Sequence, residues 1–165
     1  MGNVSHEETG FPFFIAEVAA EGPDGGGGLF AATSRCLGGT AACLEAINKL
    51  NDFLQDRGGP EAPEVDDTVF SIAANQFTAE LFVSYMEPGE LGWTYRTTRV
   101  ASFLLSDPDH VLKFHRCIRN ILGWGKGPRL RQTLAALDFL DETKRKAVQT
   151  GHDGQLAFPR RRPRK

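Results

Sequence analysis

The stretch FPFFIAEVAAE, from Phe11 to Glu21, decides the fold of this chain. It is almost entirely apolar, and turn-forming residues flank it, with Pro12 near its start and the run GPDGGGG directly after it. A short apolar run with such flanks is typical of a buried strand, so we expect a central strand over residues 11–20. Glu17 lies in the middle of that strand. A buried carboxylate is costly without a metal, a proton or a hydrogen-bonded partner, so Glu17 marks either an exposed strand end or a site.

Around this strand, the sequence predicts a single α/β domain over residues 11–148. A loose N-terminus of residues 1–10 and a disordered basic tail of residues 149–165 are expected on either side. After the glycine run, we expect a short second strand near residues 29–33 and then a helix over residues 34–55. Strand-forming side chains predict three further strands, over residues 68–74, 79–86 and 93–102.

The last third of the domain has a helical pattern. Ser106-Asp107-Pro108-Asp109 is a helix start, with a capping side chain and a proline in the first turn. The glycines between Gly123 and Gly127 predict a break, after which a second helix follows. In that second helix we expect four leucines to face inward: Leu130, Leu134, Leu137 and Leu140. The predicted fold class is therefore α/β, a mixed sheet with a long helix after the second strand and a C-terminal helical pair.

The net charge of −2 conceals a strong asymmetry. Residues 1–95 carry three Lys or Arg and fifteen Asp or Glu, whereas residues 96–165 carry sixteen and six. An acidic half beside a basic half indicates either internal pairing or a basic surface for an anionic partner. Five of the bases lie between Pro159 and Lys165, which fits a nuclear-import signal or a phosphate-binding arm.

The composition and the cysteines also indicate where in the cell the protein is expected. No apolar run is long enough to span a membrane, so we expect no membrane partner. Three cysteines without a visible export signal suggest reduced thiols and a nuclear or cytoplasmic protein. Cys36 and Cys43 lie seven residues apart on the predicted helix, too far for a shared metal or a disulfide, so we interpret both as packing residues.

The order of segments resembles a group of uncharacterised fungal proteins. The resemblance covers Phe11 to Asp138 and is carried by FPFFIAEV, LFAATSRCLGGTAACLEAINKLN, FSIAANQFTAELFVSY and FLLSDPDHVLKFHRCIRNILGWGKGPRLRQTLAALD. The domain of that group looks like the PD-(D/E)XK nuclease fold. In that fold an E-x-K pair lies on one core strand, and an aspartate on the preceding strand completes the site.

The resemblance assigns roles residue by residue. Glu17 matches the glutamate, Ala19 occupies the lysine position, and the strand with the aspartate would lie before residue 1, so the restriction-endonuclease-like core is incomplete. The family commonly has a glutamine near the start of the following helix, a position that Arg35 occupies here. Glu17 would then be the catalytic residue and Mg²⁺ ligand, with Glu21 as a candidate second carboxylate on the same side of the strand. Alanine cannot stabilise the nucleophile or the developing phosphorane charge, so we expect an inactive domain, with Mg²⁺ as cofactor only if activity survives.

An inactive nuclease-like domain would act by binding DNA or RNA through its basic C-terminal half. The candidate nucleic-acid-binding residues are basic side chains of the helical region: Lys113, Arg116, Arg119, Lys126, Arg129 and Arg131. Trp124, between these bases, either stacks on a base or fills the core. Three alternatives stay open: a protein-interaction module that binds another chain, a residual metal-dependent nuclease, and a small-anion binder that uses the glycine-rich turn.

Overall fold

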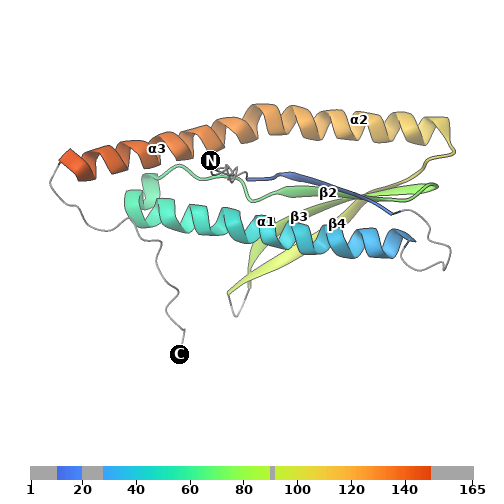
Figure 1. Ribbon diagram of the computed structural model, residues 1–165, viewed down its shortest axis with the longest axis horizontal. Coiled ribbons are helices and arrows are strands. Elements are labelled where there is room, and N and C mark those ends of the chain that lie inside the picture. The colour runs from blue at the N-terminus through green and yellow to red at the C-terminus, as the bar shows by residue number, and fades with distance from the viewer. Residues whose placement is uncertain (1–10, 20–27, 90–91, 150–165) are drawn as a thin grey trace, which may run out of the picture.

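The computed structural model describes residues 11–19, 28–89 and 92–149. Residues 1–10, Glu21 with most of the glycine-rich run, and the basic tail from residue 150 lie outside the described residues. Figure 1 shows a sheet with α1 along one side and α2 and α3 along the other, which confirms the mixed α/β class. The elements are β1 (Phe14–Val18), α1 (Gly28–Gly58), η1 (Gly59–Glu61), β2 (Val69–Ala74), β3 (Thr78–Gly89), β4 (Gly92–Leu104), α2 (Pro108–Trp124), η2 (Gly125–Arg129) and α3 (Leu130–Gln149).

The four strands form one mixed sheet in the order β1-β2-β3-β4. β1 and β2 are parallel, while β2 with β3 and β3 with β4 are antiparallel. Parallel neighbours need a crossover, and α1 supplies it. The side chains of β2 alternate between the two helical layers. Ala73 packs under α1 with Cys36, whereas Ile72 packs under α2 with Ile121.

The prediction that residues 11–20 form a central strand is wrong in one respect. The segment is a strand, but β1 has one neighbour, β2, among the described strands and lies at the sheet edge. Ala16 and Val18 are exposed there, and Val18 is 74% exposed. The buried central strand is VFSIAA of β2, which contains no charged residue and is buried at five of its six positions. A carboxylate is tolerated at Glu17 because an edge strand is partly open to water.

The predicted strand near residues 29–33 is also wrong, because α1 already begins at Gly28. Leu29, Ala32 and Cys36 extend the apolar face of the helix by one turn, and all three belong to one core cluster. Thr33 Oγ1 donates a hydrogen bond to the Leu29 carbonyl oxygen at 2.8 Å, as helical threonines commonly do. The long helix therefore follows the first strand rather than the second.

The three later strands and the start of α2 are confirmed within a few residues. Asp107 caps α2 by accepting hydrogen bonds from the backbone N–H groups of Asp109 and His110. The predicted break at the glycines is wrong. The chain passes from α2 to α3 through the five-residue π-helical turn η2, so helical backbone continues from Pro108 to Gln149.

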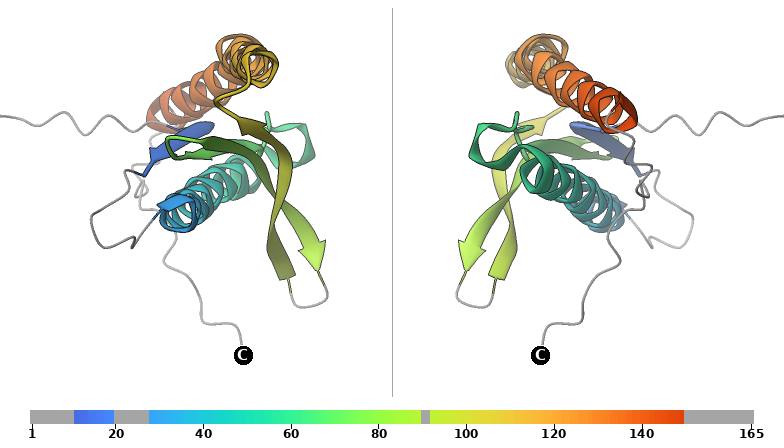
Figure 2. Two further views of the ribbon diagram at one scale, coloured as in Figure 1. Left: turned by 90° about the vertical axis from the view of Figure 1, so that its right-hand side faces the viewer. Right: turned by 90° about the vertical axis from the view of Figure 1, so that its left-hand side faces the viewer.

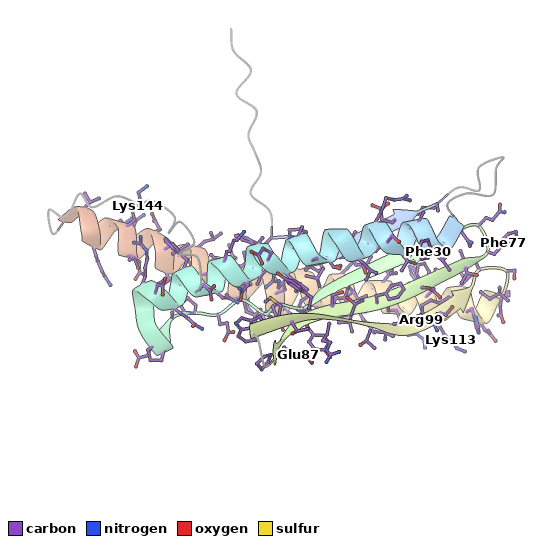
Figure 3. The ribbon with its side chains drawn as sticks, turned by 90° about the horizontal axis from the view of Figure 1, so that it is seen from below. Phe30, Phe77, Glu87, Arg99, Lys113 and Lys144 are labelled. Carbon is purple, nitrogen blue, oxygen red and sulfur yellow. The ribbon has the colours of Figure 1, made fainter. Side chains whose placement is uncertain are left out.

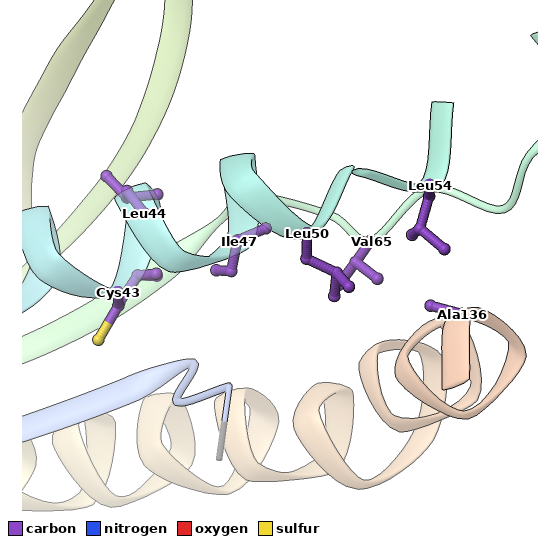
Figure 4. Close-up of a cluster of buried hydrophobic side chains, with 8 residues drawn as sticks. Cys43, Leu44, Ile47, Leu50, Leu54, Val65 and Ala136 are labelled. Carbon is purple, nitrogen blue, oxygen red and sulfur yellow. The ribbon is translucent and has the colours of Figure 1, made fainter. Parts of the chain in front are cut away.

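The inward direction predicted for the leucines of α3 is wrong for three of the four. Leu140 packs against the core, but Leu130, Leu134 and Leu137 are 47%, 49% and 46% exposed. Because helical backbone continues from α2, the register of α2 extends into α3, and at 3.6 residues per turn Leu134 lies on roughly the opposite side of the helix from Phe114, which packs on the sheet. Ala136 instead faces the cluster around Leu54 of α1 (Figure 4).

Trp124 resolves one of the open alternatives. Its ring meets the rings of Phe13 and Phe70 edge-on, with centroids 5.8 Å and 5.5 Å apart. These contacts tie the end of α2 to β2 and to the residue before β1. Trp124 is therefore a packing residue, as aromatic pairs in this geometry stabilise a core.

The β3–β4 hairpin extends beyond the rest of the sheet (Figure 2). β4 is exposed at most of its positions, and two ion pairs bind its arginines to β3. These pairs are Arg96 with Glu87 and Arg99 with Glu80, the latter at 2.7 Å. The charges of this strand are therefore largely balanced within the hairpin.

Candidate functional site

The Glu17 carboxylate lies on the face of the sheet that α1 covers. Arg35, two turns into α1, donates from Nε to Glu17 Oε2 at 2.8 Å. The Glu17 side chain is 33% exposed and that of Arg35 is 51% exposed. An ion pair this open to water contributes little to stability, so its main effect is to hold both side chains in one place.

The position that the resemblance assigns to a lysine is closed. Ala19 is 8% exposed and packs with Ala32, Cys36 and Phe82. Its backbone N–H donates to the carbonyl oxygen of Ala74 at 2.9 Å, which fixes the residue beside β2. The space around Ala19 is thus filled by apolar side chains, and no charged side chain occupies the position that the resemblance gives to the lysine.

Cys36 lies beneath the ion pair and does not provide a nucleophile. Its thiol donates to the carbonyl oxygen of Ile72 at 3.2 Å, and the side chain is fully buried. Burial, and secondarily the charge of Glu17, raises the pKa of this thiol, so it stays protonated at neutral pH. Burial also raises the pKa of Cys43, and both cysteines are packing residues as the sequence suggests.

The described residues around Glu17 do not fit a magnesium site. Mg²⁺ prefers near-octahedral oxygen ligands, and here one carboxylate is already paired with an arginine. Within residues 11–19, 28–89 and 92–149, no group of three or more His, Cys, Asp or Glu side chains is arranged to hold a metal ion. Glu21, the candidate second carboxylate, lies outside these ranges.

A second candidate surface lies on α2 and η2. Lys113, Arg116 and Arg119 follow each other at three-residue spacing, and all three are exposed, as is Lys126 in η2. The opposite face of α2, with Phe114 among others, packs on the sheet. Among the described acidic residues, none lies within ion-pair distance of these four bases. Lys113 is near one end of the long axis of the molecule (Figure 3).

Arg129 does not belong to this surface, although the sequence suggested it. It is 2% exposed, and its three side-chain nitrogens are buried without a hydrogen-bond partner among the described residues. The charges of Asp66 and Asp67 act on it from the loop before β2, but burial has the larger effect and lowers its pKa. Arg131, two residues later, is exposed on α3.

Because a buried guanidinium without acceptors is costly, replacing Arg129 by methionine should stabilise the chain. We expect the free energy of unfolding to rise by about 2 kcal/mol, measured by urea denaturation. Arg116→Met removes the same group from an exposed site and should change stability by less than about 0.5 kcal/mol. A loss of stability in Arg129→Met would show that the guanidinium is paired with the two aspartates in solution.

These features define a mixed α/β domain with an arginine-bound carboxylate on its edge strand and an unpaired basic helix face. The chain belongs to the family described as Domain of unknown function (DUF7924), whose model matches residues 3–137. No curated protein and no solved structure matches it. In the part of the chain that the structure describes, no helix has the length and apolarity needed to cross a bilayer.

Proposed function

We propose that this domain binds nucleic acid through the basic face of α2 and η2 and does not cleave phosphodiesters. Four exposed bases that form no ion pair with a described acidic residue carry the proposal: Lys113, Arg116, Arg119 and Lys126. They extend over about 20 Å of helix, enough to contact several phosphates of one strand. Such contacts recognise the backbone rather than the bases, so we expect binding with little sequence preference and strong salt dependence.

The inferred lack of cleavage rests on the surroundings of Glu17. A metal-dependent phosphodiesterase needs carboxylates for the ion and a cation near the attacking water. Here the cation is Arg35, which occupies one oxygen of the only described carboxylate at that site, and Ala19 replaces the lysine. Arg35 occupies the position at which the resemblance expects a glutamine, and its ion pair with Glu17 supports the inference of an inactive nuclease-like domain.

The binding proposal is tested by fluorescence anisotropy with labelled random-sequence DNA and RNA between about 50 and about 200 mM salt. In Arg116→Gln/Arg119→Gln, the slope of log affinity against log salt should fall by about 1.8, since two phosphate contacts are lost. Arg96→Gln/Arg99→Gln is the matched control, because it removes two arginines that are already paired with Glu87 and Glu80.

Equal loss in both double variants, or no binding at low salt, would contradict the binding proposal and favour a protein partner. In parallel, the purified chain is incubated with DNA or RNA and Mg²⁺ or Mn²⁺. Metal-dependent cleavage that disappears in Glu17→Gln would contradict the inactive site. Binding to nucleic acid would accord with the expected nuclear or cytoplasmic location, which imaging of a tagged full chain checks.

A further inference from the structure

α3 carries an apolar stripe that the fold leaves open. Leu130, Leu134 and Leu137 are each nearly half exposed, although leucines at this spacing usually lie in a core. Ala136, on another side of the helix, packs together with Phe139 and Leu140 against the cluster that α1 and the segment before β2 form. Figures 1 and 2 show α3 at the periphery, with its outer side away from the sheet and α1.

The sequence spacing of the three leucines is typical of a helix that packs against a second helix. The leucines are separated by four and then three residues, which is the seam of a two-helix coiled coil. The seam ends at Asp141, so the apolar part covers only about two turns. A partner helix of similar length, rather than a large surface, is what this stripe can bury.

The flanking charges indicate which helix fits. Arg131 and Asp138 are seven residues apart and lie on the same flank of the stripe, and both are exposed. Neither forms an ion pair with a described residue. An antiparallel copy of α3, centred on Leu134, would bring Arg131 to within one residue of the level of the partner's Asp138. Because the pair would be two-fold symmetric, the same contact would occur a second time, between Asp138 of one copy and Arg131 of the other.

In a parallel pair the two-fold axis would run along the seam and place the two copies of this flank on opposite sides of it, so Arg131 and Asp138 would not contact each other across the pair. Only the antiparallel arrangement brings the two opposite charges together, so the charge pattern favours it. We propose that two copies of this chain associate through α3, antiparallel, with the three leucines as the buried centre and two reciprocal Arg131–Asp138 ion pairs at the rim. The interface is small, and association is therefore reversible and concentration-dependent.

The stripe shares no residue with the basic face of α2 and η2. It begins at Leu130, four residues after Lys126, and continues along α3 away from Lys113. The inference does not depend on the proposed function, and each can fail while the other holds.

Sedimentation velocity of the full chain, from about 1 to about 200 µM, tests the association. The wild-type chain should shift from monomer towards dimer across this range. Leu134→Gln/Leu137→Gln should raise the dissociation constant at least about tenfold. Leu112→Gln is the control, because Leu112 is 62% exposed on α2 and lies outside the stripe. Circular dichroism checks that each variant is folded.

Charge reversal tests the reciprocal pairs. Arg131→Glu and Asp138→Arg should each weaken the dimer, and the double variant should restore it, because each ion pair is rebuilt with its signs exchanged. A double variant that is weaker than both single variants would overturn the assigned contact. A chain that stays monomeric up to about 200 µM would overturn the dimer itself.

Cysteine cross-linking tests the orientation, with dissolved oxygen as the oxidant. Leu134→Cys places the new thiol on the two-fold axis and should give a disulfide-linked dimer. Leu130→Cys should not, because in the antiparallel pair the two copies of position 130 are about 12 Å apart along the axis. Equal cross-linking at both positions would indicate a parallel pair and overturn the arrangement; the wild-type chain reports any background from its own cysteines.

Discussion

Replacing Gly125 by alanine should lower the free energy of unfolding by about 3 kcal/mol, the largest loss expected from adding one carbon atom to this chain. Gly125 is buried in η2, and a Cβ atom there would overlap the ring of Phe13. Phe13 cannot move away freely, because its ring packs on Trp124 and its carbonyl oxygen accepts the Phe70 N–H at 2.8 Å. The clash would therefore weaken the packing of Phe13, just before β1, against the end of α2 and η2.

Gly123→Ala is the matched control for this prediction. Gly123 lies two residues earlier in α2, and a Cβ there would meet nothing within 4 Å. Since alanine favours helix over glycine, this change should raise the free energy of unfolding by about 0.5 to about 1 kcal/mol. Urea denaturation of both variants measures the difference. If Gly125→Ala is as stable as the wild-type chain, the close packing of Phe13 on η2 is wrong.

Introducing at position 19 the lysine that the proposed nuclease-like pattern would require should destabilise the fold without creating an enzyme. Ala19→Lys places a long charged side chain into the cluster that contains Ala32 and Cys36. Overpacking and burial of part of the charge should together lower the free energy of unfolding by about 2 kcal/mol. The variant should also fail to cut DNA in the presence of Mg²⁺, because Arg35 still pairs with Glu17 and no second carboxylate is added.

Val18→Lys separates the effect of charge from that of burial. Val18 is the neighbouring residue of β1 and is 74% exposed, so a lysine there should change stability by less than about 0.5 kcal/mol. Thermal unfolding and nuclease assays on both variants provide the comparison. Metal-dependent cleavage gained in Ala19→Lys would refute the inactive-site interpretation. Equal stability of the two variants would contradict the tight apolar packing around Ala19.

Local sequence determined the elements that depend on near neighbours. The strand at residues 14–18, the strands at 69–74, 78–89 and 92–104, and the capped start of α2 at Asp107 were all predictable. Apolar runs, β-forming side chains and a capping aspartate before a proline each act over a few residues. The mixed α/β class follows from these elements. The sequence also singled out Glu17, through the cost of placing a carboxylate on an apolar strand.

Only the tertiary structure decided how these elements meet. That β1 lies at the edge of the described sheet depends on which strands pair with it, and the apolar run FPFFIAEV does not encode its neighbours. Helical backbone that continues from α2 through η2 turns Arg129 into the interior and Leu134 out to solvent, whereas a break at the glycines would have allowed the leucines to face inward. The ion pair between Glu17 and Arg35 likewise joins two elements through the crossover. The periodicity of apolar residues describes one helix or strand at a time. Which of its faces is buried depends on the other elements that pack against it.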